Sequence, residues 1–368
     1  MNAPMTKPLS ISNPHTPFDH PEFDGHEQVV FANDTASSLQ AIIAVHDTTL
    51  GPALGGCRMW PYANSGEALT DALRLSKGMS YKNALAGLPM GGGKAVVIAD
   101  AKTQKTPEML VALGRHIDRM AGSYITAEDV GMSDRDLEII STQTAHAGGT
   151  KARGLGNPSP YTAQGVYMGL KAAARHKFGS SNLKGLRICV KGTGSVGATV
   201  ARLAHAEGAK LWVADVYKPN LERMVNELGA TQVETSEAHK ADVDIFAPCA
   251  LGADLTPKTI REIKASIISG AANNQLASPD DGEALHQRGI LWAPDYVINA
   301  GGVISIGLAK PGDTDDTYVR QQVDAIGDTL TKIFDRAAKE NQPTSLIADH
   351  MAMEIIAAGK DKKAMTDA

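Results

Sequence analysis

Residues 185–215 read GLRICVKGTGSVGATVARLAHAEGAKLWVAD. An apolar run is followed by a glycine-rich turn, a helix-like stretch and a second apolar run that ends in an acid. This order of elements is that of a βαβ unit that binds a dinucleotide. Gly192, Gly194 and Gly197 match the G-x-G-x-x-G pattern, and Asp215 follows the glycines at close to the usual spacing of about 20 residues. The stretch therefore predicts a strand, a turn, a helix and a strand around a dinucleotide.

Each residue of this pattern has an expected role. Gly192 allows a tight turn, Gly194 lets the backbone approach a pyrophosphate, and Gly197 lets the helix pack closely on the strand. The Asp215 carboxylate would accept hydrogen bonds from ribose hydroxyls and repel a 2′-phosphate, which favours NAD over NADP as the cofactor. The alternative for Asp215 is a strand-end carboxylate that caps the next turn.

The residues that follow this unit continue the same alternation. Short apolar runs at 243–248, 265–271 and 289–294 alternate with helix-like stretches at 256–265 and 278–289. Such alternation is typical of a parallel, doubly wound sheet with helices on both faces. We therefore predict a Rossmann-type NAD-binding domain over residues 156–339. The helices expected in residues 340–368 can pack back on the first domain.

The first part of the chain predicts a second α/β unit. Apolar and β-branched runs at 27–33 and 39–47 are expected to form strands, and polar capping residues follow them at the start of a helix. A passage rich in glycine and proline at 148–160 is the expected hinge. The predicted fold class is therefore α/β with two domains. Residues 26–155 would form a substrate-binding, catalytic and oligomerisation domain, and residues 1–25 a flexible tail.

Residues 77–94, KGMSYKNALAGLPMGGGK, place two lysines around a glycine run. Lys82 lies on the predicted helix, and Lys94 follows the glycines directly. We expect Gly91 to Gly93 to form a tight turn with positive φ, which would place Lys94 beside the buried strand that follows. A solvated loop is the alternative. The spacing does not match a phosphate-binding loop.

Composition limits the kinds of partner. The chain has 368 residues, of which 43% are hydrophobic and 21% charged, with a net charge of -5 and a pI near 6.1. The length predicts two domains, and the charge excludes a basic surface for nucleic acid or membrane. The 3 cysteines show no C-x-x-C spacing, which favours reduced thiols in a cytoplasmic protein. The 11 histidines lack metal-ligand spacing, so we expect no metal site.

Seven short segments are informative when they are taken together in chain order. They are GPALGGCR (51–58), KGMSYKNALAGLPMGGGK (77–94), AEDVG (127–131), GNPSPYTAQGV (156–166), APCALG (247–252), GAANNQL (270–276) and APDYVINAGGV (293–303). In these segments the chain resembles the amino acid dehydrogenases of the glutamate, leucine, phenylalanine and valine group. Within that family it is most similar to the members that act on leucine.

The resemblance implies roles for three charged residues. Lys82 would bind the α-carboxylate of the substrate, and Lys94 and Asp129 would be catalytic. A carboxylate ligand needs a fixed cation, and a lysine beside a second cation in a desolvated cleft can serve as a general base. We expect Lys94 to activate water for attack on the iminium carbon and Asp129 to move protons to and from the amino nitrogen. Considered alone, Asp129 could instead cap the start of a helix.

The resemblance also implies a substrate pocket and further cofactor contacts. The substrate would contact Leu54, Gly55, Ala127, Asn273, Val303 and Ile306, and the cofactor Ser159, Thr162 and Asn273. Turn formation and core packing are the alternatives for these positions.

The resemblance implies reversible NAD-dependent oxidative deamination of an L-amino acid to the 2-oxo acid and ammonium, and the apolar pocket favours leucine, valine or isoleucine as that amino acid. The rival functions are the same reaction on phenylalanine or tryptophan and a non-catalytic NAD-binding or sensing protein. The resemblance further implies a homo-oligomer, and an octamer is compatible with the resemblance.

Overall fold

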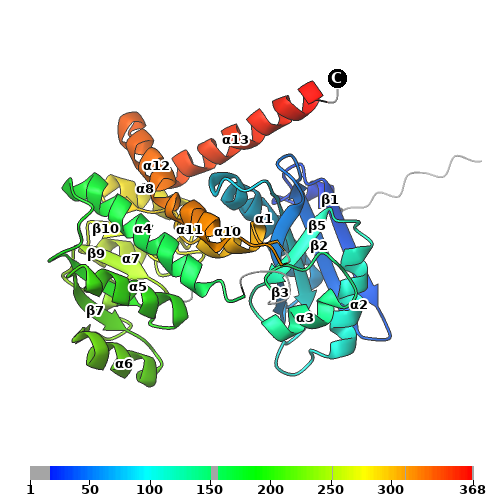
Figure 1. Ribbon diagram of the computed structural model, residues 1–368, viewed down its shortest axis with the longest axis horizontal. Helices are drawn as coiled ribbons and strands as arrows, with labels where there is room; N and C mark the ends of the chain where they lie inside the picture. Colours follow the sequence, from blue (N-terminus) through cyan, green and yellow to red (C-terminus); the bar gives the residue numbers. More distant parts are fainter. Residues whose placement is uncertain (1–16, 151–155, 251, 311, 367–368) are drawn as a thin grey trace, which may run out of the picture.

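The computed structural model describes residues 17–150, 156–250, 252–310 and 312–366, and it contains two sheets that lie side by side (Figure 1). The first sheet has the strand order β1-β2-β4-β3-β5. Its strands are β1 (Gln28–Asp34), β2 (Leu39–Asp47), β3 (Ala53–Trp60), β4 (Gly91–Ile98) and β5 (Tyr124–Glu128). β2 runs antiparallel to β1 and β4, whereas β3 runs parallel to β4 and β5. The strands predicted at 27–33 and 39–47 are confirmed.

The second sheet has the strand order β11-β10-β9-β6-β7-β8, and all of its pairs are parallel. Its strands are β6 (Arg187–Lys191), β7 (Lys210–Ala214), β8 (Thr231–Gln232), β9 (Ile245–Pro248), β10 (Ile267–Ile268) and β11 (Leu291–Trp292). In β6, Ile188 and Val190 belong to one apolar cluster and Cys189 to another, because successive side chains point to opposite faces. Both faces are covered by helices, as predicted for a doubly wound sheet.

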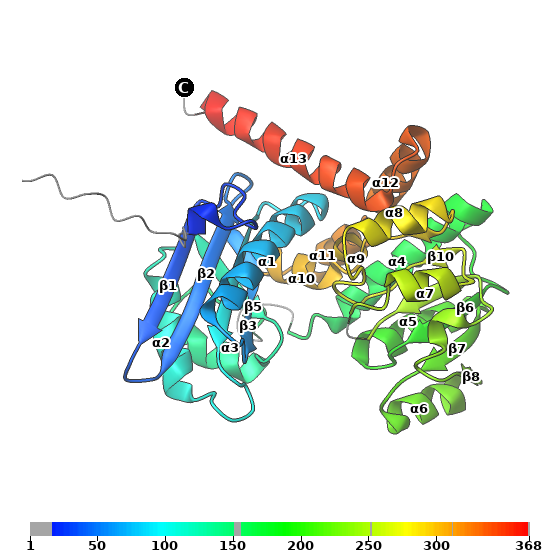
Figure 2. The same cartoon turned by 180° about the vertical axis from the view of Figure 1, so that it is seen from behind.

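Helices surround both sheets (Figure 2). Around the first sheet lie α1 (Ser65–Leu85), α2 (Pro107–Asp118) and α3 (Asp134–Ser141). Around the second lie α4 (Ser159–Phe178), α5 (Ser195–Ala206), α6 (Lys218–Leu228), α7 (Pro257–Glu262), α8 (Asp280–Gln287), α9 (Asp295–Ile298), α10 (Gly301–Gly307), α11 (Asp316–Asp324) and α12 (Ile326–Glu340). The 3-10 helices η1 (Pro17–Asp19) and η3 (Ala238–Lys240) are short, and α13 (Thr344–Thr366) ends the described chain.

Helix α1 carries Lys82 in its last turn and packs on the first sheet. It begins where the sequence predicted, because the Asn64 side chain accepts a hydrogen bond of 3.0 Å from the backbone N–H of Glu67. Its buried residues Ala68 and Leu73 join Val96 of β4 in one apolar cluster. The packing of α1 on β4 thus brings the two parts of the lysine stretch together.

The glycines before Lys94 lie in a strand, so the predicted turn is wrong. Gly91 to Gly93 form the start of β4, and none of the three has a positive φ. Their role is close packing, because a Cβ on Gly92 would lie 2.0 Å from the backbone nitrogen of Ser80 in α1. A Cβ on Gly93 would lie 2.7 Å from the Tyr124 ring. Glycine is required here because helix and strand touch backbone to backbone.

The last helix returns from the second sheet toward the first. Figure 1 shows α13 as a long helix that begins beside α12 and passes α1. The Tyr296 hydroxyl donates a hydrogen bond of 2.5 Å to Asp349 near the start of α13. Near its end, Lys360 lies 3.3 Å from Asp47 of β2. The C-terminal helix therefore contacts the first domain, as the sequence analysis allowed.

The described part of the N-terminal segment also packs on α1. The His20 imidazole lies 3.1 Å from the Thr70 hydroxyl, and Asp24 forms an ion pair of 2.8 Å with Lys77. The sequence predicted a flexible tail over residues 1–25, but His20 and Asp24 contact α1. Residues 1–16 lie outside the described chain. The centre of the expected hinge, residues 151–155, also lies outside it. Within the described ranges, none of the helices is long and apolar enough to cross a membrane.

Candidate active site

Lys94 on β4 and Asp129 after β5 form a direct ion pair across the intervening strand β3 of the first sheet. The Lys94 ammonium on β4 donates a hydrogen bond of 2.6 Å to Oδ2 of Asp129, the residue that follows β5. Lys94 is only 6% exposed. Burial alone would raise the pKa of Asp129, but the charges of Lys94 and Arg58 outweigh burial and lower this pKa to about 2. Asp129 is therefore an ionised carboxylate held beside a buried amine.

Asp129 does not cap a helix. The nearest helix is α3, and its cap is Ser133, whose hydroxyl accepts a hydrogen bond of 3.4 Å from the backbone N–H of Asp136. A second cation, Arg58 on β3, donates from Nε to Oδ2 of Asp129 at 3.1 Å. The helix-capping alternative for Asp129 is therefore wrong.

Lys82 connects the two domains through a chain of amides. Its ammonium donates a hydrogen bond of 2.6 Å to Oδ1 of Asn299, which ends α9. The Asn299 amide in turn donates to Oδ1 of Asn273 at 2.7 Å and to the Ala271 carbonyl at 3.1 Å. Lys82 can only donate, so it requires an oxygen at Asn299 and fixes the orientation of both amides. Asn273 is therefore connected to Lys82 through the Asn299 amide.

The electrostatics of Lys82 also connect it to the ion pair. Burial lowers the pKa of Lys82 to about 8, Asp295 opposes this effect, and the charge of Lys94 adds to it. Asp295 itself is 8% exposed, and burial raises its pKa. An amine whose charged form is this costly gains much from an anionic ligand. The two lysines therefore share one electrostatic environment, which suits an anionic substrate.

The predicted apolar residues lie where α10 meets the first sheet. Leu54 on β3 is 1% exposed, and its Cδ2 lies 3.4 Å from the position of a Cβ on Gly307. The Ile306 side chain lies 2.8 Å from the corresponding position on Gly148, whose backbone N–H donates to the Thr126 carbonyl of β5 at 2.7 Å. Leu54 and Ile306 thus meet residues of the opposite domain.

The other predicted pocket residues, Ala127, Val303 and Gly55, have separate surroundings in the two domains. Ala127 is buried in β5 opposite Gly56, whereas Val303 packs on the core of the second domain. Gly55 accepts a hydrogen bond of 2.7 Å from the Tyr124 hydroxyl through its carbonyl.

The glycine turn has the geometry that a dinucleotide requires. Gly192 has a φ of 93°, and a Cβ on Gly197 would lie 1.9 Å from the Gly192 carbonyl oxygen. Gly194 precedes α5, and a Cβ there would meet no atom within 4 Å. The turn is tight, the helix packs closely, and the backbone at Gly194 is open to an approaching pyrophosphate. The residues present therefore fit a dinucleotide.

Asp215 follows β7, where its carboxylate already has partners in the protein. It accepts hydrogen bonds of 2.6 Å from the backbone N–H of Thr193 and 2.8 Å from that of Tyr217. Burial opposes ionisation, but these bonds outweigh it and lower the pKa of Asp215. These hydrogen bonds are the ones that the turn-capping alternative predicts for Asp215. They also keep the carboxylate ionised beside the glycine turn, where a ribose would lie.

Ser159 and Thr162 stand at the start of α4. The Ser159 backbone N–H donates to Asn157 at 3.0 Å, and the Thr162 hydroxyl donates to the Pro158 carbonyl at 3.2 Å. A Cβ on Gly302 would lie 2.8 Å from this hydroxyl, so the first turn of α4 adjoins α10. The Asn157 side chain therefore satisfies the backbone N–H of Ser159, the Thr162 hydroxyl satisfies the Pro158 carbonyl, and Thr162 lies near the helix that carries Val303 and Ile306.

Two residues of the site were not predicted from the sequence. Arg58 closes the segment GPALGGCR, and Asn299 lies inside APDYVINAGGV. Each is a polar residue within an apolar, glycine-rich segment, and this was the signal that could have identified them.

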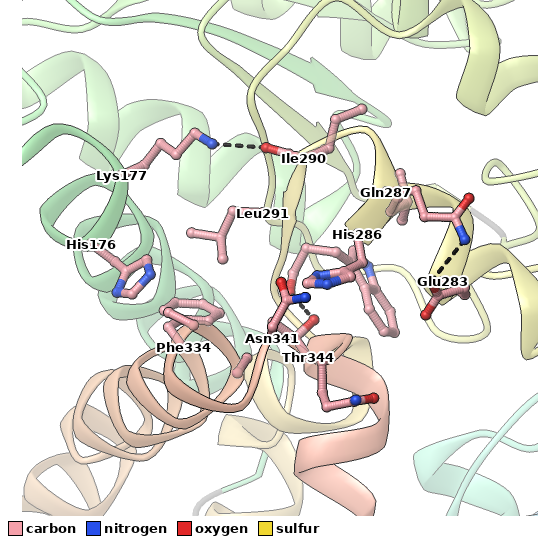
Figure 3. Close-up of a pocket in the computed structure, with 17 residues that line it drawn as sticks. His176, Lys177, Glu283, His286, Gln287, Ile290, Leu291, Phe334, Asn341 and Thr344 are labelled. Carbon is pink, nitrogen blue, oxygen red and sulfur yellow. Dashed lines mark hydrogen bonds between the residues drawn. The ribbon is translucent and has the colours of Figure 1, made fainter.

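A separate cavity of about 580 Å³ lies between α4, α8 and α12 (Figure 3). His176 and Phe334 line it, while Lys177 donates a hydrogen bond of 2.8 Å to the Gly289 carbonyl at its edge. None of the predicted site residues lines this cavity. It is therefore distinct from the cluster formed by the lysines. Within the described ranges, no group of three or more His, Cys, Asp or Glu side chains could hold a metal ion.

Comparison with known proteins places this geometry in a family. Residues 23–146 match the model of the Glu/Leu/Phe/Val dehydrogenase dimerisation domain, and residues 214–367 match the Glutamate/Leucine/Phenylalanine/Valine dehydrogenase model. Leucine dehydrogenase of Bacillus cereus is 47% identical over 348 residues, which is 94% of this chain and 95% of that protein. Valine dehydrogenase of Streptomyces albus is 42% identical over 95% of this chain and 97% of its own length.

A solved structure is also similar over most of the chain. The crystal structure of L-tryptophan dehydrogenase from Nostoc punctiforme matches with a TM-score of 0.81 and 42% identity, and covers 91% of this chain and 97% of its own. The glycine turn, the paired lysines and the carboxylate thus occur within a chain that matches these proteins along nearly its whole length. The chain belongs to the Glu/Leu/Phe/Val dehydrogenase family.

Proposed function

We propose that the protein catalyses the reversible NAD-dependent oxidative deamination of leucine, valine and isoleucine. As a family member it is an amino acid dehydrogenase that uses a nicotinamide cofactor. The observation that carries the proposal is the buried pair of Lys94 and Asp129 next to the carboxylate anchor Lys82. The net reaction is L-amino acid + NAD⁺ + H₂O → 2-oxo acid + NH₄⁺ + NADH + H⁺.

Each charged residue has one task in this reaction. Lys82 pairs with the α-carboxylate of the substrate and keeps its bond to Asn299, because an ammonium has three donors. When bound, the nicotinamide supplies the acceptor for the hydride that leaves the α-carbon. Lys94, once neutral, takes a proton from the water that attacks the iminium carbon, and Asp129 accepts and returns protons at the amino nitrogen. These tasks require an amine and a carboxylate within hydrogen-bonding distance of each other, which is the arrangement found.

The preference for aliphatic substrates rests on the apolar residues at the junction of the domains. Leu54, Ala127, Val303 and Ile306 offer no charge to a substrate side chain. One methylene in such a pocket changes discrimination by only about 1–3 kcal/mol, so leucine, valine and isoleucine overlap as substrates. The similarity to the tryptophan dehydrogenase favours one second candidate, the same reaction on aromatic amino acids.

The cofactor and assembly proposals rest on single features. Asp215 is ionised beside the glycine turn and would repel a 2′-phosphate, which supports NAD over NADP. The match of residues 23–146 to a dimerisation domain supports a homo-oligomer, and we propose an octamer. Mass measurement in solution tests the number of subunits.

The decisive experiment is a spectrophotometric assay of NADH formation with each amino acid at alkaline pH. Leucine, valine and isoleucine should each support turnover, and 4-methyl-2-oxopentanoate should be aminated faster than phenylpyruvate or indole-3-pyruvate. Faster amination of either aromatic oxo acid would favour the second candidate. NADH binding without turnover on any substrate would identify a sensing protein and end the proposal.

A further inference from the structure

Arg58 is a second, fixed cation on the carboxylate of Asp129. Strand β3 lies between β4, which carries Lys94, and β5, which leads to Asp129. Arg58 on β3 donates from Nε to the same Oδ2 that accepts from Lys94, at 3.1 Å and 2.6 Å respectively. The Arg58 side chain is 18% exposed and that of Asp129 is 20% exposed. One carboxylate oxygen therefore bonds two cations from two adjacent strands.

A second carboxylate holds Arg58 from the other side. Its NH1 group donates to Oδ2 of Asp71 in α1 at 2.8 Å. Asp71 also accepts from the Tyr62 hydroxyl at 2.7 Å and from Arg74 at 3.0 Å. The Arg58 guanidinium is therefore fixed at both ends, and it can rotate only if one of two partly buried ion pairs breaks.

The two cations on Asp129 differ in chemistry. In the proposed function, on which this inference rests, Lys94 must be neutral when it takes a proton from water. A neutral amine no longer pairs with a carboxylate, so at that step Asp129 depends on its remaining cation. Arg58 cannot lose its proton in a protein. We propose that Arg58 is the positioning residue that keeps Asp129 ionised and correctly oriented while Lys94 changes its charge.

The test compares three arginine variants of the full-length enzyme. Arg58→Gln should lower kcat for leucine deamination by about 100-fold, while KM for leucine and NAD changes by less than about threefold. Arg58→Lys keeps a cation at this place and should retain within about tenfold of the wild-type kcat. Arg74→Gln is the matched control, because it removes an exposed cation from Asp71 without touching Asp129.

The pH profile separates positioning from a structural role. Loss of a fixed cation favours the protonated form of a neighbouring acid, so the acid limb of kcat/KM should move up by about one pH unit in Arg58→Gln. The limb should stay in place in Arg74→Gln. An unmoved limb in Arg58→Gln, or equal loss of kcat in Arg58→Gln and Arg58→Lys, would overturn the proposal.

A readout without turnover keeps this inference distinct from the proposed function. Infrared titration of enzyme labelled with ¹³C-aspartate, with Asp129→Asn as the reference, follows the Asp129 carboxylate directly. Between pH 4 and 6, approximate limits within which a carboxyl of ordinary to slightly raised pKa titrates, Asp129 should stay ionised in Lys94→Ala, where Arg58 is the remaining cation, and take up a proton in the double variant Lys94→Ala/Arg58→Gln. An ionised Asp129 throughout this range in the double variant would refute the role of Arg58, even if the wild type oxidised no amino acid.

Discussion

The ammonium of Lys82 donates a hydrogen bond of 2.6 Å to the side-chain oxygen of Asn299, a residue 217 positions away in the chain. The bond links α1, which packs on the first sheet, to the end of α9, which packs beside the second. Lys82 is therefore held by one domain and oriented by the other. If Lys82 binds the substrate carboxylate as proposed, substrate binding and the contact between the domains depend on the same amine.

Asn299→Ala should weaken binding of the oxo acid more than it slows chemistry. The change removes the acceptor for the Lys82 ammonium and the donor to Asn273 and the Ala271 carbonyl. A hydrogen bond to a charged group contributes about 1.5–3 kcal/mol, so we expect KM for 4-methyl-2-oxopentanoate to rise about tenfold or more. Steady-state kinetics of amination measure this. An unchanged KM with a reduced kcat would show that Asn299 acts elsewhere.

Binding of a simple carboxylate should weaken at alkaline pH. Burial lowers the pKa of Lys82 to about 8, so above that pH the free enzyme must take up a proton before it pairs with a carboxylate. The inhibition constant of 4-methylpentanoate should be constant below this pH and rise by up to about tenfold per unit above it. Lys82→Arg, which stays charged, should remove this rise. An inhibition constant that does not change across the alkaline range in the wild type would contradict the assignment.

Lys94→Ala should abolish turnover and leave cofactor binding intact. The amine is the proposed base, and proton transfer of this kind accounts for about 10²–10⁴-fold in rate. Fluorescence titration should give the same affinity for NADH as in the wild type, because the glycine turn lies on the other sheet. Lys77→Ala is the control, because it removes a more exposed lysine of α1 whose ion-pair partner is Asp24 in the N-terminal segment. Retained turnover in Lys94→Ala would reject the catalytic role.

Gly92→Ala should destabilise the first domain. The added Cβ would lie 2.0 Å from the Ser80 backbone nitrogen, and neither backbone can move without separating α1 from β4. We expect a loss of about 3 kcal/mol or more in the free energy of unfolding by urea. In the same helix, an added Cβ on Gly78 meets no atom within 4 Å, so Gly78→Ala should instead stabilise by about 0.5–1 kcal/mol. Equal effects of the two changes would disprove the packing argument.

Asp215→Asn should narrow the preference for NAD over NADP. The variant keeps an oxygen for the backbone N–H of Thr193 or Tyr217 and loses the negative charge. If repulsion of the 2′-phosphate sets the preference, the ratio of kcat/KM for the two cofactors should fall at least about tenfold. A ratio unchanged in Asp215→Asn would assign the carboxylate to turn capping alone.

Local patterns in the sequence were sufficient for the elements of the fold. Gly192 and Gly194 lie between β6 and α5 and Gly197 lies in the first turn of α5, as their spacing predicts. The cap at Asn64 marks the start of α1, and the alternating segments of the second half form the parallel sheet. These features depend on residues close together in the chain. The ligand roles of the site residues stay predictions until they are tested on the enzyme.

Contacts between distant residues were decided only by the tertiary structure. Gly91 to Gly93 read as a turn in the sequence but form a strand, because α1 and Tyr124 press on them from outside the segment. Arg58 reaches Asp129 across 71 positions, which no local pattern records. The sequence alone determined which residue types stand at the ends of strands and helices, since backbone geometry and capping are local. Strand order and domain packing determined which charges meet, because ion pairs and amide chains form between side chains that only the fold brings together.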